Sequence, residues 1–356
     1  MISVLITGVG GGGIGEQILK ALRLSDLQYE FIGTDTSTVS KGLQEVDFGY
    51  VVPAAKEPAY IQALLEICEK HKVAALFPGS EPELQVIGAS RQIFAAAGVF
   101  LPINPESVID ICLDKSKTMK FLAREGFAFP ASYTISSIKD LGQVSTFPCV
   151  LKPSVGGGGS ANTMIAQSSD ELEAFALFLL KIYPEFIVQE YVGSAEQEYT
   201  VGVLCDMEGN LINSITIKKN ILGGLNNRIK IPNRSDRNDL GSVLAISSGI
   251  SQGEVVSKSD INATCEMIAT RIGATSAINI QCRYYQGKVF VFEINPRYSG
   301  TTSLRALVGY NEPDYMLRTH LQGENIPAFF PYRLGNIVRG LKEVLVDSKN
   351  VVDLRN

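Results

Sequence analysis

Histidine is scarce in this chain and tryptophan is absent. Only two histidines, His71 and His320, occur among 356 residues, which limits any mechanism that pairs a histidine base with a nucleophile. We therefore disfavour a Ser-His-Asp hydrolase, and we expect each histidine to lie on the surface of a helix.

Paired cysteines and long apolar runs are also missing. The apolar start, Met1–Ile6, runs directly into glycines without a charged region or a cleavage site, and no apolar stretch approaches the length of a membrane span. We expect a cytoplasmic protein with no membrane partner, no disulfide and no zinc site. The six scattered cysteines, which we expect to be buried, are Cys68, Cys112, Cys149, Cys205, Cys265 and Cys282.

Basic residues do not outnumber acidic ones. The chain has 32 Lys and Arg against 37 Asp and Glu, for a formal net charge of -5. This balance argues against the broad basic face that a nucleic acid partner requires, so any phosphate site must be local. With 45% hydrophobic and 19% charged residues, the chain is long enough for two or three globular domains.

The first part of the chain alternates strands and helices. A β-branched run, a glycine cluster and a helical pattern follow one another between residues 3 and 22. This order predicts a Rossmann-like parallel sheet wrapped by helices over residues 1–110. The other expected elements are strands at Phe31–Asp35 and Val73–Phe77 and a helix at Tyr60–His71.

After residue 105 the pattern changes to an α+β body with antiparallel strands. A helix from about Asp114 to Glu125 ends at Gly126. Residues 222–256 are rich in Gly, Asn, Ser and Arg without a clear period, so we expect a mobile functional loop there. Strands are expected at Cys149–Lys152, Ile187–Tyr191, Glu198–Leu204, Leu211–Ile217, Ala277–Gln281 and Val289–Ile294, and helices at 169–182 and 259–272.

Residues 292–297 place oxygen ligands beside a cation. On a strand, Glu293 and Asn295 project from one face, whereas Phe292 and Ile294 turn into the core. Mg²⁺ takes one or two protein carboxylates, keeps some waters and completes its shell with substrate phosphates. The open pair of side chains therefore predicts a magnesium site.

Whether Gln281 joins this row depends on the turn between its strand and the next. A three-residue loop at 285–287 keeps Gln281 on the face of Glu293. A two-residue turn at 286–287 would put it on the opposite face. Both turns are open at this point.

The glycine cluster at residues 8–13 satisfies the Gly-x-Gly-x-x-Gly fingerprint of dinucleotide sites, and Asp35 ends the next strand, where a ribose-binding acid is expected. An NAD-dependent oxidoreductase is therefore an open alternative. A glycine turn at a helix N-terminus binds any anion, however. The same turn, at Gly11 and Gly12, equally predicts a phosphate or a substrate carboxylate.

A second glycine run follows the strand that carries Lys152. The backbone amides of such a loop can approach phosphates while the lysine adds a point charge. The spacing of Gly156–Ser160 does not match the Walker A motif. The segment therefore predicts a phosphate loop of another kind.

Taken in order, these motifs resemble the ATP-grasp superfamily, and in particular its branch similar to the large subunit of carbamoyl phosphate synthase. The resemblance implies an α/β plus α+β fold, with a Rossmann-like parallel sheet followed by a two-lobed ATP-grasp domain. It implies ATP and Mg²⁺ (or Mn²⁺) as cofactors, and a homodimer. The implied domains are 1–110 (N-terminal), 111–190 (small lobe, a lid) and 191–356 (large lobe with the metal site and the C-terminal segment).

The resemblance also assigns roles to individual residues. Arg297 is similar to the arginine that steadies the transferred phosphoryl group, and Lys152 to the strand lysine that contacts the phosphates. Gln281, Glu293 and Asn295 match the metal ligands. The implied nucleotide contacts are Lys115, Lys152, Gly157, Gly158 and Ser160 for the phosphates, Glu190, Tyr191 and Val192 for adenine, and Glu198 for the ribose.

The resemblance implies a ligase in which ATP phosphorylates a carboxylate and an amine attacks the acyl phosphate, with amino-acid or peptide-like substrates. Gly300 stands where the branch has a further arginine, so phosphorylation of bicarbonate or a carbamate stays an alternative. A nucleotide-binding sensor without turnover is another. For the substrates, Glu81 and Glu83 could hold an amine, and Arg283 and Arg305 are candidate carboxylate clamps.

Overall fold

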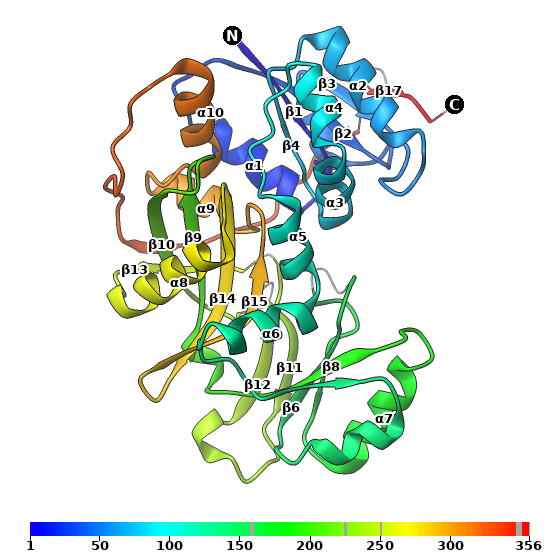
Figure 1. Ribbon diagram of the computed structural model, residues 1–356, viewed down its shortest axis with the longest axis vertical. Helices are drawn as coiled ribbons and strands as arrows, with labels where there is room; N and C mark the ends of the chain where they lie inside the picture. Colours follow the sequence, from blue (N-terminus) through cyan, green and yellow to red (C-terminus); the bar gives the residue numbers. More distant parts are fainter. Residues whose placement is uncertain (157–159, 224–225, 250, 347–350, 356) are drawn as a thin grey trace.

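The N-terminal glycine cluster joins a strand to a helix of a parallel sheet. β1 (Ile2–Ile6) pairs in parallel with β2 (Tyr29–Asp35) and with β4 (Ala75–Phe77), which confirms the predicted Rossmann-like sheet. The computed structural model describes residues 1–356 except 157–159, 224–225, 250, 347–350 and 356 (Figure 1). The helices of this domain are α1 (Ile14–Leu22), η1 (Lys41–Gln44), α2 (Tyr60–His71), α3 (Glu81–Ala89), α4 (Arg91–Ala96) and α5 (Glu106–Leu113).

The chain returns to this sheet near its other end. β3 (Phe48–Val51) lies beside β2, and β17 (Val351–Asp353) pairs in parallel with β3. The sheet order is β17-β3-β2-β1-β4. The last strand thus belongs to the N-terminal sheet, although the sequence assigned the C-terminal segment to the large lobe.

The small lobe, at the bottom of Figure 1, is an antiparallel sheet covered by one helix. Its order is β5-β8-β6-β7, and α7 packs on it through a buried cluster that includes Leu172 and Leu179 of the helix and Val188 of the sheet. The elements are β5 (Ser132–Ile135), η2 (Ile138–Gln143), β6 (Cys149–Pro153), β7 (Met164–Ala166), α7 (Ser169–Leu179) and β8 (Phe186–Glu190).

The large lobe is a six-stranded sheet with one apolar face and one face that is polar around a cavity. Alternate residues of a strand face opposite sides of the sheet. On β14, Ile278 and Ile280 pack in the core with residues of α8. Asn279 and Gln281, between and after them, line a cavity on the other side of the sheet. The order is β15-β14-β9-β10-β13-β16. The elements are α6 (Lys115–Arg124), η4 (Ala195–Gln197), β9 (Glu198–Cys205), β10 (Leu211–Lys219), β13 (Gly253–Val256), α8 (Ser259–Ile272), β14 (Ala277–Tyr285), β15 (Lys288–Asn295), α9 (Thr302–Leu307), α10 (Glu312–Gln322) and β16 (Gly335–Ile337).

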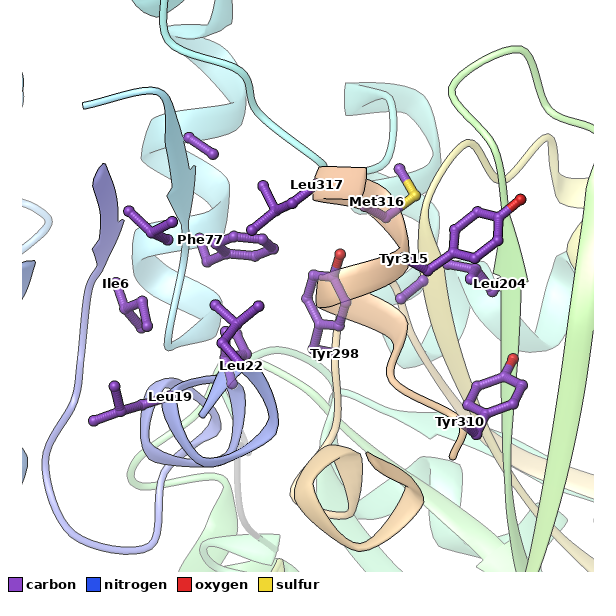
Figure 2. Packing of buried hydrophobic residues seen from close by; sticks show 14 of the residues in the cluster. Ile6, Leu19, Leu22, Phe77, Leu204, Tyr298, Tyr310, Tyr315, Met316 and Leu317 are labelled. Carbon is purple, nitrogen blue, oxygen red and sulfur yellow. The ribbon is translucent and has the colours of Figure 1, made fainter. Parts of the chain in front are cut away.

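A hydrophobic cluster joins the N-terminal domain to the large lobe. Figure 2 shows Leu22 and Phe77 of the N-terminal domain facing Tyr298 and Leu317. The rings of Phe77 and Tyr298 lie 5.5 Å apart, edge to face, and the cluster continues to Leu204 of β9. Because these side chains are fully or almost fully buried, the contact fixes the two parts relative to each other.

Residues 222–256 are not the irregular loop that their composition predicted. They contain β11 (Asn227–Pro232), η6 (Asn238–Leu240), β12 (Val243–Ser247) and β13, and β11 pairs with β12 in a separate antiparallel hairpin. The prediction was wrong because the many Asn, Ser and Gly residues obscured a period of two.

The β11–β12 hairpin is anchored by the apolar residues of that hidden period. Ile229 and Ile231 alternate with exposed polar residues along β11. They pack with Leu244 of β12 and with Ile165 and Tyr191 of the small lobe and its connection. The hairpin is therefore part of the small lobe's packing and not a free segment.

The connection between β14 and β15 decides between the two turns that the sequence left open. It is a two-residue turn, in which Gln286 and Gly287 both have positive φ, so a regular ladder would turn Gln281 away from Glu293. A β-bulge at Phe292 shifts the register by one, and Gln281 pairs with Glu293.

The bulge also moves Phe292 out of its predicted place in the core. The side chain of Phe292 is only half-buried and lines the cavity. Ile294, beyond the bulge, is 1% exposed and lies in the core as predicted.

The segment from β8 to β9 is not a hairpin. β8 belongs to the small lobe and β9 to the large lobe, so residues 191–197 connect the two sheets.

The six cysteines are buried, as expected. Within the part of the chain that the structure describes, no helix is long and apolar enough to cross a bilayer.

Candidate active site

The polar face of the large sheet opens into a cavity of about 590 Å³. The N-terminal domain, the small lobe and the large lobe all contribute to its wall. Most of the residues predicted for the site therefore meet in one place. Among them, the cavity is lined by Gly12, Glu81, Lys115, Lys152, Ser160, Glu190, Tyr191, Val192, Glu198, Gln281, Arg283, Glu293, Asn295 and Arg297.

Glu293 and Asn295 lie at the end of β15 and line the cavity. Gln281 Nε2 donates to Glu293 Oε2 over 3.0 Å. Among the described residues no group of three or more His, Cys, Asp and Glu side chains could hold a metal ion. One carboxylate and one amide oxygen fit a divalent ion that takes its other ligands from nucleotide phosphates and water.

Arg297 is held beside this pair by the N-terminal domain. Its Nη2 donates to Glu81 Oε1 over 2.6 Å and to Asn295 Oδ1 over 3.0 Å. Burial would raise the pKa of Glu81, but the charge and hydrogen bond of Arg297 outweigh it and lower the pKa. Glu81 is therefore a carboxylate that orients the arginine.

Lys152 projects from β6 of the small lobe onto the bulge of β15. Its Nζ donates to Phe292 O over 3.0 Å and lies 5.6 Å from the centre of the Phe292 ring. Burial lowers the pKa of Lys152 to about 7. A bound phosphate would restore the charge of this lysine, since a nearby anion favours the ammonium form.

Lys115 reaches the cavity from the first turn of α6. Asp114 caps the helix by accepting from the backbone N–H groups of Ser116 and Lys117 over 2.8 and 3.1 Å. Lys115 N itself donates to Ser154 O over 3.0 Å. The cap fixes where the helix begins and thereby directs the lysine to the cavity.

The connection between the lobes forms the opposite wall. The Tyr191 hydroxyl donates to Ala245 O over 3.0 Å and accepts from Ala245 N over 2.8 Å, which fastens the β11–β12 hairpin. The carboxylate of Glu190 lies 3.6 Å from Arg237. Glu190, Tyr191 and Val192 all line the cavity beside this hairpin.

Glu198 sits on the floor between two cations. Its Oε1 accepts from Lys219 over 3.2 Å and its Oε2 from Arg283 Nη2 over 3.1 Å. Burial raises the pKa of this carboxyl, but Lys219 and Arg283 outweigh it, so the pKa is lowered and Glu198 stays ionised.

Of the predicted phosphate loop, Gly157 and Gly158 lie outside the described residues. Ser160 lines the cavity and has a positive φ of 61°. Its hydroxyl donates to Ser247 O of the hairpin over 3.4 Å. Ser160 and the end of β12 therefore meet at the wall of the cavity.

The N-terminal glycine turn uses two of its amides internally. Gly10 N donates to Asp35 Oδ2 over 2.7 Å, and Gly12 N donates to Glu16 Oε2. These amides are not free for a dinucleotide, and Asp35 is engaged with the turn instead of facing a ribose. Gly12 lines the cavity, whereas Gly11 does not.

Glu83 is a structural residue and not a substrate ligand. It is 7% exposed, accepts from Ser80 and Tyr60 hydroxyls over 2.7 and 3.1 Å, and does not line the cavity. Burial raises its pKa. The expectation that it binds a substrate amine was wrong because its carboxylate is buried against the hydroxyls of Tyr60 and Ser80, the residue that caps α3.

The two arginines proposed as substrate clamps are also committed to the protein. The Arg283 guanidinium donates to Glu198, Val192 O, Gly193 O and Ala245 O, which uses all five of its N–H groups. It also stacks on Tyr191 at 4.2 Å. Arg283 lines the cavity but has no donor left for a ligand.

Arg305 is fully buried and does not line the cavity. Its Nη1 pairs with Glu312 Oε1 at 3.0 Å and its Nη2 donates to Asn279 Oδ1 at 2.5 Å. The prediction was wrong because sequence spacing could not show that Glu312, one helix later, neutralises this arginine.

Sequence reasoning missed Lys219, which lies at the end of β10 and is 6% exposed. Its ammonium donates to Gln281, Ser247 and Glu198. A signal was present in the sequence, because Lys219 lies on the same face of its strand as Ile215 and Ile217. A lysine that alternates with buried apolar residues in this way indicates that its charge has a partner inside the protein.

Two protein families match parts of this chain. The family described as "PylC-like, N-terminal domain" matches residues 4–102, and the family described as "ATP-grasp in the biosynthetic pathway with Ter operon" matches residues 183–343. The carbamoyl phosphate synthase large chain of Archaeoglobus fulgidus is 24% identical over 312 residues, which cover 84% of this chain. The chain spans only 27% of the length of that relative.

Solved structures share the fold. An N5-carboxyaminoimidazole ribonucleotide synthetase in complex with ADP superposes with a TM-score of 0.65 at 14% identity, covering 94% of this chain and 78% of that one. An L-amino acid ligase from Bacillus licheniformis gives a TM-score of 0.62 at 15% identity, with coverage of 90% and 74%. The predicted two-lobed ATP-grasp fold is thereby confirmed.

Proposed function

The chain belongs to the ATP-grasp superfamily, and on that premise we propose that it is an ATP-dependent ligase that joins a carboxylate to an amine. One observation carries the proposal. Two lysines, an arginine and two oxygen ligands from the small lobe and the large lobe converge on a single cavity beside the lobe connection. Phosphoryl transfer asks chiefly for such positioning and charge neutralisation.

In this proposal the lobe connection and Glu198 bind the nucleoside, while Lys115 and Lys152 bind the phosphates. Glu293 and Asn295 would hold Mg²⁺, which neutralises the β- and γ-phosphates when bound. These assignments agree with the burial of Lys152 and Glu198 and with the shared cavity.

The chemistry proceeds in two steps. A substrate carboxylate oxygen attacks the γ-phosphorus, the bond to the β-phosphate oxygen breaks, and ADP leaves with the electron pair. Arg297 stabilises the charge that develops on the transferred group. A neutral amine then attacks the acyl carbon, inorganic phosphate leaves, and the amine loses a proton to water.

Phosphorylation of bicarbonate or a carbamate is the second candidate. The similarity to carbamoyl phosphate synthase large chains favours it. In that reaction the same residues would serve, and only the acceptor would differ. Amino-acid or peptide-like acceptors and bicarbonate are therefore compared in one experiment.

The test is ADP release measured against pools of amino acids, dipeptides and bicarbonate, each with MgATP. We expect release that depends on one acceptor class, and we expect Glu293→Ala to abolish it while the circular dichroism spectrum and Tm stay close to wild type. Undiminished activity of that variant would overturn the metal assignment. Binding of NAD without binding of ATP would overturn the proposed function and favour an oxidoreductase.

A further inference from the structure

Lys219 donates hydrogen bonds to three side chains, one of which, Gln281, contacts the proposed metal ligand Glu293. Its Nζ donates to Gln281 Oε1 over 2.6 Å, to Ser247 Oγ over 2.8 Å and to Glu198 Oε1 over 3.2 Å. An ammonium has three N–H groups, so every donor of Lys219 has a protein acceptor. The lysine is fixed in the floor of the cavity and has no donor left for a substrate.

The acceptors around Lys219 are a carboxylate, an amide carbonyl and a hydroxyl. Hard divalent cations select oxygen ligands of this kind. Glu198 and Ser247 are 2% and 8% exposed, so the ammonium supplies the positive charge that this buried oxygen set requires.

Lys219 also decides what Gln281 can offer to an ion. Because an ammonium only donates, Gln281 must turn Oε1 toward Lys219. Its Nε2 then faces Glu293 and donates to Oε2 over 3.0 Å. An N–H group cannot ligate a cation, so Gln281 presents a donor, and not an oxygen, to the row that contains Glu293.

We propose that Lys219 excludes a divalent ion from the oxygen set of Glu198, Ser247 and Gln281, so that the cavity holds one ion, bound by Glu293 and Asn295. This inference rests on the proposed function, since it concerns the ion that accompanies the nucleotide. It departs from the expectation that Gln281 is a metal ligand. It also predicts that nucleotide binding saturates with a single ion and shows no second phase of activation at high Mg²⁺.

The test counts ions, with Mn²⁺ as the probe and the full chain saturated with an ATP analogue that has a β,γ-imido bridge. Electron paramagnetic resonance of free Mn²⁺ gives the stoichiometry. We expect one bound Mn²⁺ per chain for wild type and for Lys219→Arg, which keeps the cation. We expect two for Lys219→Met, because Gln281 can then turn its oxygen outward beside Glu198.

Two bound ions in wild type, or one in a folded Lys219→Met protein, would overturn the inference. If that variant does not fold, anomalous scattering from wild-type crystals with Mn²⁺ and the analogue decides the matter. One peak between Glu293 and Asn295, with Lys219 still on Gln281, supports the inference, and a second peak refutes it. If the analogue does not bind to wild type, the proposed function fails and this inference with it.

Discussion

Gln281 and Glu293 face each other across β14 and β15 only because one extra residue, Phe292, bulges out of the ladder between them. The two-residue turn alone would have put the two side chains on opposite faces. The bulge also presents Phe292 O to Lys152. A local irregularity thus brings a lysine of the small lobe against the strand of the large lobe that carries Glu293 and Asn295.

Nucleotide binding will weaken as the pH rises above 7, because of Lys152. Burial lowers the pKa of the free lysine to about 7, whereas bound phosphate favours the ammonium and raises the pKa. Above pH 7 the lysine must therefore take up a proton on binding, and the affinity falls by at most about tenfold per pH unit. Calorimetry between pH 7.5 and 9 measures the slope. Lys152→Met should bind more weakly and lose this slope; an equal slope in both proteins would contradict the account.

Arg283→Lys will lower both the stability of the protein and its affinity for ADP. Lysine has three donors in place of five and cannot join Glu198, the lobe connection and the hairpin at once. We expect a loss of about 2 kcal/mol in unfolding free energy and about tenfold in ADP affinity. Urea denaturation and calorimetry measure the two. Arg228→Lys, at an exposed hairpin position, should change neither.

Arg305→Met will destabilise the protein more than any variant above. It leaves Glu312, which is fully buried, without its ion-pair partner, and such a loss costs about 3–5 kcal/mol. Removing both charges, in Arg305→Met with Glu312→Met, should recover most of that loss. Denaturant unfolding of the two single variants and the double variant measures the coupling. Additive losses would show that the pair does not act as a unit.

Gly300→Ala will affect the part of the cavity next to α9. A Cβ at Gly300 would lie 2.2 Å from Gly249 O, so the backbone of the connection between β12 and β13 must move, at a cost of about 1–3 kcal/mol. Gly300 precedes α9, which packs on α1, and is separate from the lobe connection. We therefore expect reduced turnover with an unchanged Kd for ADP. Gly142→Ala, where a Cβ meets nothing within 4 Å, is the control; a weakened Kd for ADP in Gly300→Ala alone would contradict this separation.

Much of the architecture follows from local patterns in the chain. The strand, glycine turn and helix at the start, the capped helix after Asp114, and the position of Glu293 beside Asn295 all depend on periodicity and capping within a few residues. These are short-range properties, so the sequence predicts them without knowledge of the partners.

The remaining features depend on contacts between distant residues. Phe292 bulges because of how two strands pair, and nothing in its neighbours along the chain marks it. Arg305 and Arg283 looked like ligand clamps until Glu312 and Glu198 were found against them. A charge in the sequence shows that a partner is needed, but whether that partner is protein or ligand is settled only by the fold.

The most direct test of the central claim is a crystal structure of the protein with MgADP. We predict nucleotide density between the lobe connection and β15, with an ion in contact with Glu293 and Asn295. Density confined to the glycine turn at residues 8–13, with no ion at Glu293, would contradict the account.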